Sequence, residues 1–319
     1  MTAKDGAASP VYLSDESPKD KPWDLHRGQA EAVERLYELG GYARYAKRIR
    51  ECSRRLQYAV DRSDESVVFR LKSAQFCRVR FCPVCQWRRN KMWVGRFLEA
   101  LPKYLEDHPR LVPLYLTLTV KNCHLSDLRA TVQTMNAAFK RLTERKTWPG
   151  VGWVKSMEVT KGKDGPDMAH PHFHVLLFVR PGYFKGGEYI KAETWRELWQ
   201  HALRAKYLPV VNVKRVKAKE KPSEASDGLQ GVSGAIVETL KYSIKPDELV
   251  EDAEFLYQVT EQLHKVRAVA VGGNLRPYLK RLEDDGNLIT EKIDAELEDT
   301  APRIVFDWAT EVKRYAKRN

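Results

Sequence analysis

The sequence has no long hydrophobic run, no internal repeat and no recognisable export signal. Although 43% of its 319 residues are hydrophobic, no stretch approaches the roughly 18 uncharged apolar residues that a membrane-spanning helix requires. Residues 1–22 lack the apolar core of a secretory signal. We therefore expect a soluble cytoplasmic protein with no membrane partner. In that reducing compartment, its five cysteines are expected to be thiols or metal ligands rather than disulfides.

The chain also has too few acidic residues to balance its basic ones. Asp and Glu number 43 against 55 Lys and Arg, which gives a net charge of +12. An excess of positive charge favours a polyanionic partner, because neutralising phosphates releases counterions. Nucleic acid is the first candidate, but many basic proteins bind none, so the charge alone does not decide.

Strand and helix patterns alternate after residue 110. They mark six elements in the order strand, helix, strand, strand, helix, strand, at 111–120, 125–145, 152–162, 172–180, 192–206 and 208–216. The short turn between the second and third strands predicts a hairpin. We therefore predict an α+β fold in which a ferredoxin-like (RRM-like) β-α-β-β-α-β unit forms a central antiparallel sheet.

The stretch "HPHFHVLLF" places histidines on one face of the third strand. Residues two apart in a strand share a face, so His172 and His174 lie side by side. Two imidazoles need one further donor to hold a divalent ion with open coordination positions. Glu158, in the facing strand of the hairpin, is the candidate carboxylate, and His170 is the alternative ligand. The competing interpretation is a set of satisfied polar residues at a strand end.

A helix predicted at 234–246 adds further reactive groups. At helical spacing, Glu238, Tyr242 and Lys245 cluster opposite the apolar residues Ile236, Val237, Leu240 and Ile244. Tyrosine can act as a covalent nucleophile, and a carboxylate can activate it or a water molecule. The three residues can thus address one reaction centre, although an ordinary exposed helix face would carry the same pattern.

Cysteines gather in "CRVRFCPVC", which holds Cys77, Cys82 and Cys85, with Cys52 upstream. Three close cysteines and a distant fourth suit a closed tetrahedral Zn²⁺ site of four thiolates. We therefore predict a structural zinc site. The alternative is a set of buried free cysteines or a redox pair.

Arginines and aromatic residues surround these cysteines. Such side chains suit DNA, through phosphate pairing and base stacking. We predict DNA contacts for Arg78, Arg80, Trp87, Arg88, Arg89 and Lys91. A second basic segment, 40–60, either follows a phosphate backbone or forms a solvated helix face, and the pattern does not separate the two.

With these motifs in place, the chain resembles the HUH endonucleases, most closely the rolling-circle replication initiators (Rep proteins) of small plasmids that use one tyrosine plus a glutamate. The matching motifs, in the family's order, are "YLTLTV" (115–120), "HPHFHVLLF" (170–178) and "VETLKYSIKP" (237–246). The resemblance covers about 105–290, because "KVRAVAVGGNLRPYLK" (265–280) also looks like the family's continuation.

The resemblance implies a metal-dependent, site-specific nickase and strand transferase. His172 and His174 would bind Mg²⁺ or Mn²⁺, and Tyr242 would attack a phosphodiester of single-stranded DNA, leaving a 5′-phosphotyrosine link and a free 3′-OH. Glu238 would activate water at termination, and Lys245 would lower the pKa of the tyrosine or contact the phosphate. The implied partners are single-stranded and duplex DNA at a plasmid replication origin, with a host helicase and polymerase.

Four regions follow from this interpretation. We predict a disordered N-terminal tail at 1–40, a basic cysteine-rich zinc module at 41–103, an HUH endonuclease domain at 104–290 and a C-terminal extension at 291–319.

Two alternative functions remain open. Within the same chemistry, the chain would be an HUH-type single-strand transposase or a relaxase. In a different class, it would be a zinc-containing regulator that binds nucleic acid without catalysis. Loss of DNA binding on removal of the active-site metal, together with a covalent adduct, would distinguish the enzyme from the regulator.

Overall fold

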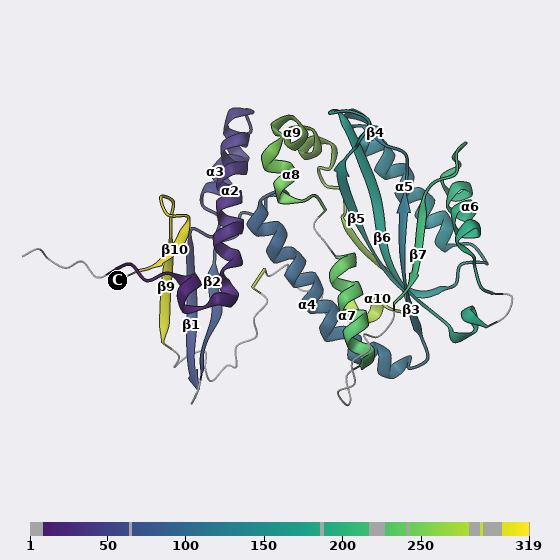
Figure 1. Cartoon of the computed structure of the whole chain (residues 1–319), viewed down its shortest axis with the longest axis horizontal. Coiled ribbons are helices and arrows are strands. Elements are labelled where there is room, and N and C mark those ends of the chain that lie inside the picture. Colours follow the sequence, from purple (N-terminus) through teal and green to yellow (C-terminus); the bar gives the residue numbers. More distant parts are fainter. Residues whose placement is uncertain are drawn as a thin grey trace, which may run out of the picture. The chain divides into compact units, whose positions relative to one another are not determined.

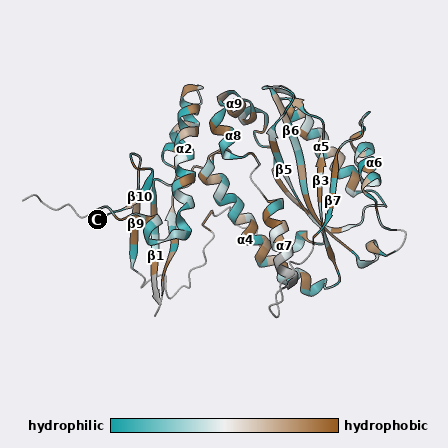
Figure 2. Ribbon diagram, in the orientation of Figure 1, coloured by the Kyte–Doolittle hydropathy of each residue, from teal (hydrophilic) through white to brown (hydrophobic). Residues whose placement is uncertain are grey.

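The computed structural model describes residues 9–63, 66–185, 188–216, 227–240, 243–280, 288–289 and 302–318 (Figure 1). Hydrophobic residues follow the strands of the larger sheet, as the brown segments of β3, β5 and β6 show in Figure 2. Within the described ranges, no helix is long and apolar enough to cross a membrane.

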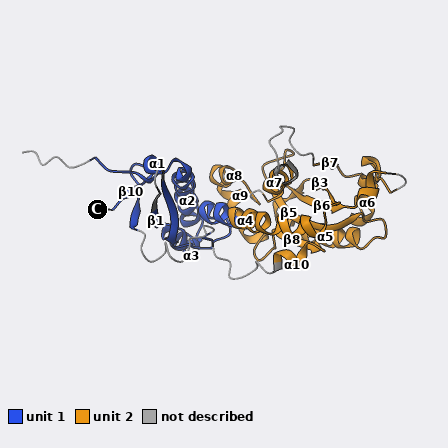
Figure 3. Cartoon of the chain, turned by 90° about the horizontal axis from the view of Figure 1, so that it is seen from below, with its two compact units in different colours: residues 1–89, 287–319 blue, residues 90–286 orange. Residues whose placement is uncertain are grey.

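The chain divides into two compact units (Figure 3). Unit 1 contains residues 1–89 and 287–319, and unit 2 contains residues 90–286. Unit 1 is thus built from both ends of the sequence, whereas unit 2 is one continuous segment. The helix α4 (Pro83–Asp107) begins in the first unit and continues into the second.

Unit 1 combines helices with a four-stranded antiparallel sheet in the order β10-β9-β1-β2. The helical elements are α1 (Leu13–Glu16), η1 (Pro18–Asp20), α2 (Pro22–Leu39) and α3 (Ala43–Arg50). The strands are β1 (Arg55–Ser63), β2 (Ser66–Ala74), β9 (Arg303–Ala309) and β10 (Arg314–Lys317).

The structure corrects the predicted N-terminal tail. Residues 13–39 are largely helical, and α2 buries Trp23, Val33 and Tyr37. These apolar residues recur at helical spacing, and burying each stabilises the fold by about 1.5–3 kcal/mol. Residues 1–8 lie outside the described part.

The predicted C-terminal extension is part of unit 1 in the structure. Within 291–319, the described residues 302–318 form β9 and β10, which bury Phe306 and Tyr315 in unit 1. The boundary between the units falls after residue 89 rather than after residue 103. The cysteine module therefore includes both ends of the chain, because its sheet requires strands from each.

Unit 2 contains a six-stranded sheet in which β7-β3-β6-β5-β8 are neighbours in that order, all antiparallel, and β4 pairs with β6. The strands are β3 (Val112–Thr119), β4 (Cys123–His124), β5 (Gly150–Lys161), β6 (Met168–Val179), β7 (Val211–Arg215) and β8 (Val269–Gly273). The helical elements after α4 are η2 (Leu125–Asp127), α5 (Leu128–Thr143), η3 (Pro181–Phe184), α6 (Ala192–Leu203), α7 (Asp227–Thr239), α8 (Pro246–Glu251), α9 (Ala253–Gln262) and α10 (Arg276–Lys280). The predicted strand, helix, strand, strand, helix, strand series is present, and the α+β prediction is confirmed.

The two faces of this sheet pack against different helices. Phe173 of β6 contacts Phe139 of α5, with ring centroids 6.1 Å apart. Leu176 and Phe178 lie on the opposite face of β6 from Phe173. They belong to a core cluster with residues of α4, α7 and α10. Because side chains alternate along a strand, His172 and His174 share the face that packs against α7.

The helix predicted at 234–246 begins and ends earlier in the structure, as α7 (Asp227–Thr239). α7 ends at Thr239, and Lys245 is extended (φ −65°, ψ 135°) just before α8. The residue before a proline avoids the helical region, which explains why no continuous helix reaches Pro246. Ile236, Leu240 and Ile244 are buried as predicted, whereas Val237 is 52% exposed.

Candidate metal sites and catalytic site

A carboxylate and two imidazoles meet on the sheet of unit 2. In the β5–β6 register, Glu158 is opposite His172, and Ser156 is opposite His174. The Oε2 atom of Glu158 lies 2.6 Å from Nε2 of His174 and 3.2 Å from Nε2 of His172. One ligand atom from each residue lies within 4.8 Å of the other two. The hairpin geometry thus brings together the predicted metal ligands.

The electrostatics of this group suit a divalent cation. Burial raises the pKa of Glu158, but the hydrogen bonds and charges of His172 and His174 lower it by a larger amount. The net pKa is therefore well below its ordinary value. Glu158 is 7% exposed and is therefore a buried carboxylate that is anionic at neutral pH. Two imidazole nitrogens and one carboxylate oxygen can hold a divalent metal and leave coordination positions open.

The alternative ligand His170 lies beside the group but has another partner. Its Nδ1 atom is 2.8 Å from Oδ1 of Asn122. His170 is not one of the three residues whose ligand atoms converge. The structure therefore favours Glu158 as the third ligand.

Tyr115 contacts the group and was missed by the sequence analysis. Its hydroxyl is 2.6 Å from Nδ1 of His174, and the two rings stack with centroids 5.7 Å apart. If Nε2 of His174 held a metal, Nδ1 would carry the proton and its N–H would donate a hydrogen bond to the oxygen of Tyr115. The stretch "YLTLTV" was predicted to be a strand, but nothing in it indicated that Tyr115 would lie beside His174.

The segment after α7 is attached to β5 on both sides of Glu158. The hydroxyl of Ser156 donates to the carbonyl of Thr239, and the backbone N–H of Val159 donates to the carbonyl of Ser243 over 2.8 Å. The predicted nucleophile Tyr242 falls between these attachments but lies outside the described residues.

Glu238 is exposed near the end of α7. Burial raises the pKa of Tyr115 well above its ordinary value, and the charges of Glu238 and Glu158 raise it further. Glu238 is therefore close enough to interact electrostatically with the group that contacts His174.

Lys245 and Glu248 follow this segment in the chain. Lys245 is exposed. Burial raises the pKa of Glu248 above its ordinary value, and the charge of Glu158 adds to this increase. The charge of Lys245 partly opposes it. The Oε2 atom of Glu248 is buried and has no hydrogen-bond partner among the described residues. The sequence analysis did not single out this carboxylate.

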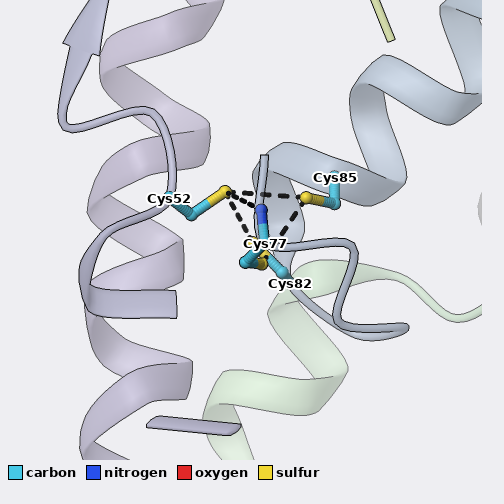
Figure 4. A group of neighbouring side chains, drawn as sticks. All are labelled: Cys52, Cys77, Cys82 and Cys85. Carbon is cyan, nitrogen blue, oxygen red and sulfur yellow. Dashed lines mark hydrogen bonds between the residues drawn. The ribbon is translucent and has the colours of Figure 1, made fainter. Parts of the chain in front are cut away.

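The four predicted zinc ligands converge in unit 1 (Figure 4). The Sγ of Cys52 lies 3.5 Å from that of Cys85 and 3.7 Å from that of Cys82, and Cys77 Sγ lies 3.6 Å from Cys85 Sγ. Four thiolates around Zn²⁺ with Zn–S bonds of about 2.3 Å would have sulfurs about 3.8 Å apart. The spacing therefore fits a tetrahedral zinc site.

Backbone groups also point at the sulfurs. The N–H of Arg78 donates to Cys85 Sγ over 3.3 Å, and the N–H of Cys77 donates to Cys52 Sγ over 3.4 Å. Hydrogen bonds from the other cysteines lower the pKa of Cys85 far below its ordinary value, whereas burial raises that of Cys82. A cation would stabilise all four thiolates, which is the chemistry of a structural metal site.

Two of the predicted DNA contacts are interior residues instead. Trp87 is 7% exposed and Arg88 is 1% exposed. The guanidinium of Arg88 lies 5.2 Å from the ring of Trp23 and 5.5 Å from that of Trp87, and its Nε donates to the carbonyl of Leu288 over 2.9 Å. The structure thus corrects their predicted role: they pack unit 1 and do not face solvent.

The other four predicted contacts differ in accessibility. Arg80 is mostly buried, and burial, together with the charge of Arg89, lowers its pKa to about 10. Arg78 and Lys91 are exposed, and Arg89 is half-buried. These three remain available as DNA contacts.

The fold and the sites define a mixed α+β protein with a four-cysteine cluster and a separate Glu-His-His group. The model of the Rep_1 family, described as "Replication protein", matches residues 68–316. The chain belongs to this family of replication proteins, and its membership supports the predicted role in initiating plasmid replication.

Relatives with the printed names "Protein rep" and "Replication protein" are similar over most of their length. The chain is 31% identical to Protein rep of Streptococcus pneumoniae serotype 2 (88% of this chain, 87% of the relative). It is 32% identical to Protein rep of Lentilactobacillus hilgardii (93% and 95%) and 31% identical to a Replication protein of Staphylococcus aureus (68% and 95%). No solved structure matches the chain significantly.

Proposed function

We propose that the chain initiates rolling-circle replication of a plasmid as an HUH-type, single-tyrosine DNA nickase and strand transferase. The observation that carries the proposal is the convergence of Glu158, His172 and His174 beside the segment that contains Tyr242, in a chain of the replication-protein family. The strand order β7-β3-β6-β5, with α5 and α6 as the connecting helices, supports the ferredoxin-like form of this fold.

Glu158, His172 and His174 would hold Mn²⁺ or Mg²⁺. When bound, such an ion polarises the scissile phosphate and stabilises its developing charge. Tyr115 orients His174 through the contact at Nδ1. Glu158 is buried and its carboxylate contacts both histidines, so that the ligands need little rearrangement.

Tyr242 would supply the nucleophile. The tyrosine loses its phenolic proton as its oxygen forms a bond to phosphorus. The bond between phosphorus and the 3′-oxygen breaks, and the 3′-oxygen takes a proton to become a free 3′-OH. The products are a 5′-phosphotyrosine link and a primer end for a polymerase. Lys245 would contact the phosphate or lower the pKa of Tyr242. At termination, Glu238 would take a proton from a water whose oxygen attacks phosphorus. The bond between phosphorus and the oxygen of Tyr242 breaks, and the tyrosine oxygen takes a proton, so that one tyrosine suffices.

The four cysteines would hold Zn²⁺ as a structural ion in unit 1. The partners of the whole chain would be single-stranded and duplex DNA at the plasmid origin, followed by a host helicase and polymerase. Arg78, Arg89 and Lys91 are the surface residues of the predicted DNA-contact set that fit this role.

The test is formation of a covalent adduct. The full chain is incubated with labelled single-stranded oligonucleotides that tile the DNA flanking its gene, in Mn²⁺ or EDTA, and resolved on a denaturing gel. We expect a Mn²⁺-dependent adduct that Tyr242→Phe abolishes while DNA binding persists, because only the nucleophilic oxygen is removed. The exposed Tyr189→Phe is the matched control and should retain the adduct.

Three results would contradict the proposal. Adduct formation by Tyr242→Phe would show that another residue is the nucleophile. Binding that persists in EDTA with no adduct on any strand would instead favour a non-catalytic, zinc-containing regulator. An adduct that is resealed to a second strand without replication would favour the transposase or relaxase alternative.

A further inference from the structure

A basic cavity lies within unit 1, which contains none of the Glu-His-His residues. Its volume is about 220 Å³. We call it the arginine pocket, after the residues in its lining that carry the argument: Arg27, Arg35, Arg50, Arg54, Trp308 and Thr310. They come from α2, the end of α3, the turn before β1, and β9 with the turn that follows it. The pocket therefore joins segments from both ends of the sequence.

Arg27 places a buried positive charge in this lining. The side chain is 2% exposed, and its Nη1 and Nη2 atoms donate to the carbonyls of Ile49 and Arg50, each over 3.0 Å. Carbonyl oxygens carry no net charge, so these bonds orient the guanidinium without neutralising it. Its Nε atom is buried and has no hydrogen-bond partner in the described part of the chain. An anionic ligand would compensate a buried charge of this kind.

The two carboxylates in the lining already accept hydrogen bonds from cationic side chains. Glu31 accepts hydrogen bonds from Trp308, Thr310 and Lys313. Glu34 accepts from Nε of Arg50 over 2.7 Å. Both acids are thus paired with a cation, and neither is available to neutralise the remaining arginines.

Arg35 and Arg54 supply the surplus charge. Both are exposed, and no ion pair joins either of them to another residue within the described ranges. Guanidinium groups bind phosphate oxygens through paired hydrogen bonds and remain charged at any working pH. The exposed Arg44 and Lys47 of α3 extend the positive charge of the element that provides Arg50.

The size and charge of the arginine pocket together indicate its ligand. A volume of about 220 Å³ is smaller than the roughly 300–1,000 Å³ of typical organic-ligand sites, but it accommodates a phosphate group with part of its sugar. We infer that the pocket binds a phosphodiester of the DNA backbone and anchors the DNA on unit 1. The inference rests on the proposed function for its choice of DNA. Such a contact sets position rather than sequence.

The test measures binding separately from cleavage. The affinity of the full chain for a labelled duplex oligonucleotide and for its single strand is measured by fluorescence anisotropy from about 50 to 200 mM salt. We expect the double variant Arg35→Ala/Arg54→Ala to bind at least about tenfold more weakly and to lower the slope of log K against log salt by about one or more. Both side chains are exposed, so the variant should retain the Tm of the wild type.

Arg55→Ala is the matched control. Arg55 is adjacent to Arg54 and equally charged, but its Nε donates to Asp307 over 2.7 Å and it does not line the pocket. It should retain wild-type affinity and salt slope. If the double variant also retains both, the inference is wrong.

A second experiment distinguishes binding of free phosphate from binding of the DNA backbone. Inorganic phosphate is titrated into the wild type and the double variant by calorimetry. Phosphate binding that the double variant loses, with DNA affinity unchanged, would identify a free-phosphate site and overturn the DNA anchor. Failure of the proposed function is distinguishable, because it appears as absence of a wild-type adduct, whereas this inference is decided by affinity and salt slope alone.

Discussion

The backbone N–H of Val159 donates to the carbonyl oxygen of Ser243 over 2.8 Å. Each residue directly follows a member of the proposed catalytic site, Glu158 and Tyr242 respectively. The strand that provides the carboxylate ligand therefore also holds the chain next to the proposed nucleophile. This attachment explains how a tyrosine far along the sequence from the histidines can belong to the same site.

Replacing Glu238 by alanine should separate the first and second steps of the reaction. The variant should form the Mn²⁺-dependent adduct at close to the wild-type rate, because Tyr242 and the metal ligands are unchanged. Release of the DNA should fall by about 100-fold or more, since the general base for water is lost. Time courses of adduct formation and decay measure both steps. Glu197→Ala, an exposed glutamate of α6, is the control, and normal release by Glu238→Ala would rule out the water-activating role.

Tyr115→Phe should weaken metal binding without removing a ligand. The hydroxyl that contacts Nδ1 of His174 is lost, and such orienting contacts typically contribute 10–100-fold to metal affinity or activity (about 1.4–2.8 kcal/mol). We expect the Mn²⁺ concentration for half-maximal adduct formation to rise, with recovery at high Mn²⁺. Tyr278→Phe, which removes a hydroxyl bonded to Asp107 over 2.7 Å, should leave the Mn²⁺ dependence unchanged. A uniform loss of activity that high Mn²⁺ does not restore would indicate only a packing role.

Cys82→Ser should remove the zinc and destabilise unit 1 together. The binding energy of a structural zinc contributes to folding, so we expect loss of bound zinc and a Tm lower by roughly 5–15 °C. Elemental analysis and thermal unfolding measure the two effects. Cys123, an isolated half-buried thiol of β4, gives the control Cys123→Ser. A Cys82→Ser protein that is fully folded without metal would contradict the structural zinc site.

Glu31 should make the stability of unit 1 sensitive to acid. Burial raises the pKa of this carboxyl, but hydrogen bonds from Lys313, Trp308 and Thr310 lower it to a net value below the ordinary 4.5. A depressed pKa stabilises the folded state above the unfolded pKa, and this stabilisation is lost as the pH falls through the folded pKa. Glu31→Gln should therefore reduce the free energy of unfolding by about 1–3 kcal/mol at pH 7 and much less below pH 4 or so.

Urea unfolding at several pH values tests this dependence. The exposed Glu311→Gln, in the turn between β9 and β10, is the control and should follow the wild-type profile. An equal destabilisation of Glu31→Gln at neutral and acid pH would show that shape, rather than charge, accounts for the effect.

The two candidate metal-binding groups were predictable because their geometry is local. His172 and His174 share a face through the two-residue period of a strand, and a hairpin places Glu158 opposite them. The cysteine cluster follows from similar reasoning, since three of its ligands lie within nine residues of each other.

The rest depended on contacts between distant segments. Tyr115 reaches His174 only because β3 pairs with β6, a pairing that no short-range pattern specifies. Arginines beside tryptophans fit a DNA surface and a buried stack equally well, and Arg88 turned out to form the stack with Trp23. A helix was predicted to run through Tyr242 to Pro246, but α7 ends at Thr239 and Lys245 is extended.

The pairing of β1 with β9 also affects how the protein is made. Arg55 contacts Asp307 across 252 positions of sequence, so the sheet of unit 1 is incomplete until residues beyond 302 have left the ribosome. Residues 90–286, in contrast, form one continuous folding unit that is synthesised earlier. A chain interrupted during translation would thus carry the proposed nicking residues but lack the β9 residues that line the arginine pocket. If the arginine pocket anchors DNA as inferred, a chain that lacks β9 would hold DNA less firmly than one that includes it.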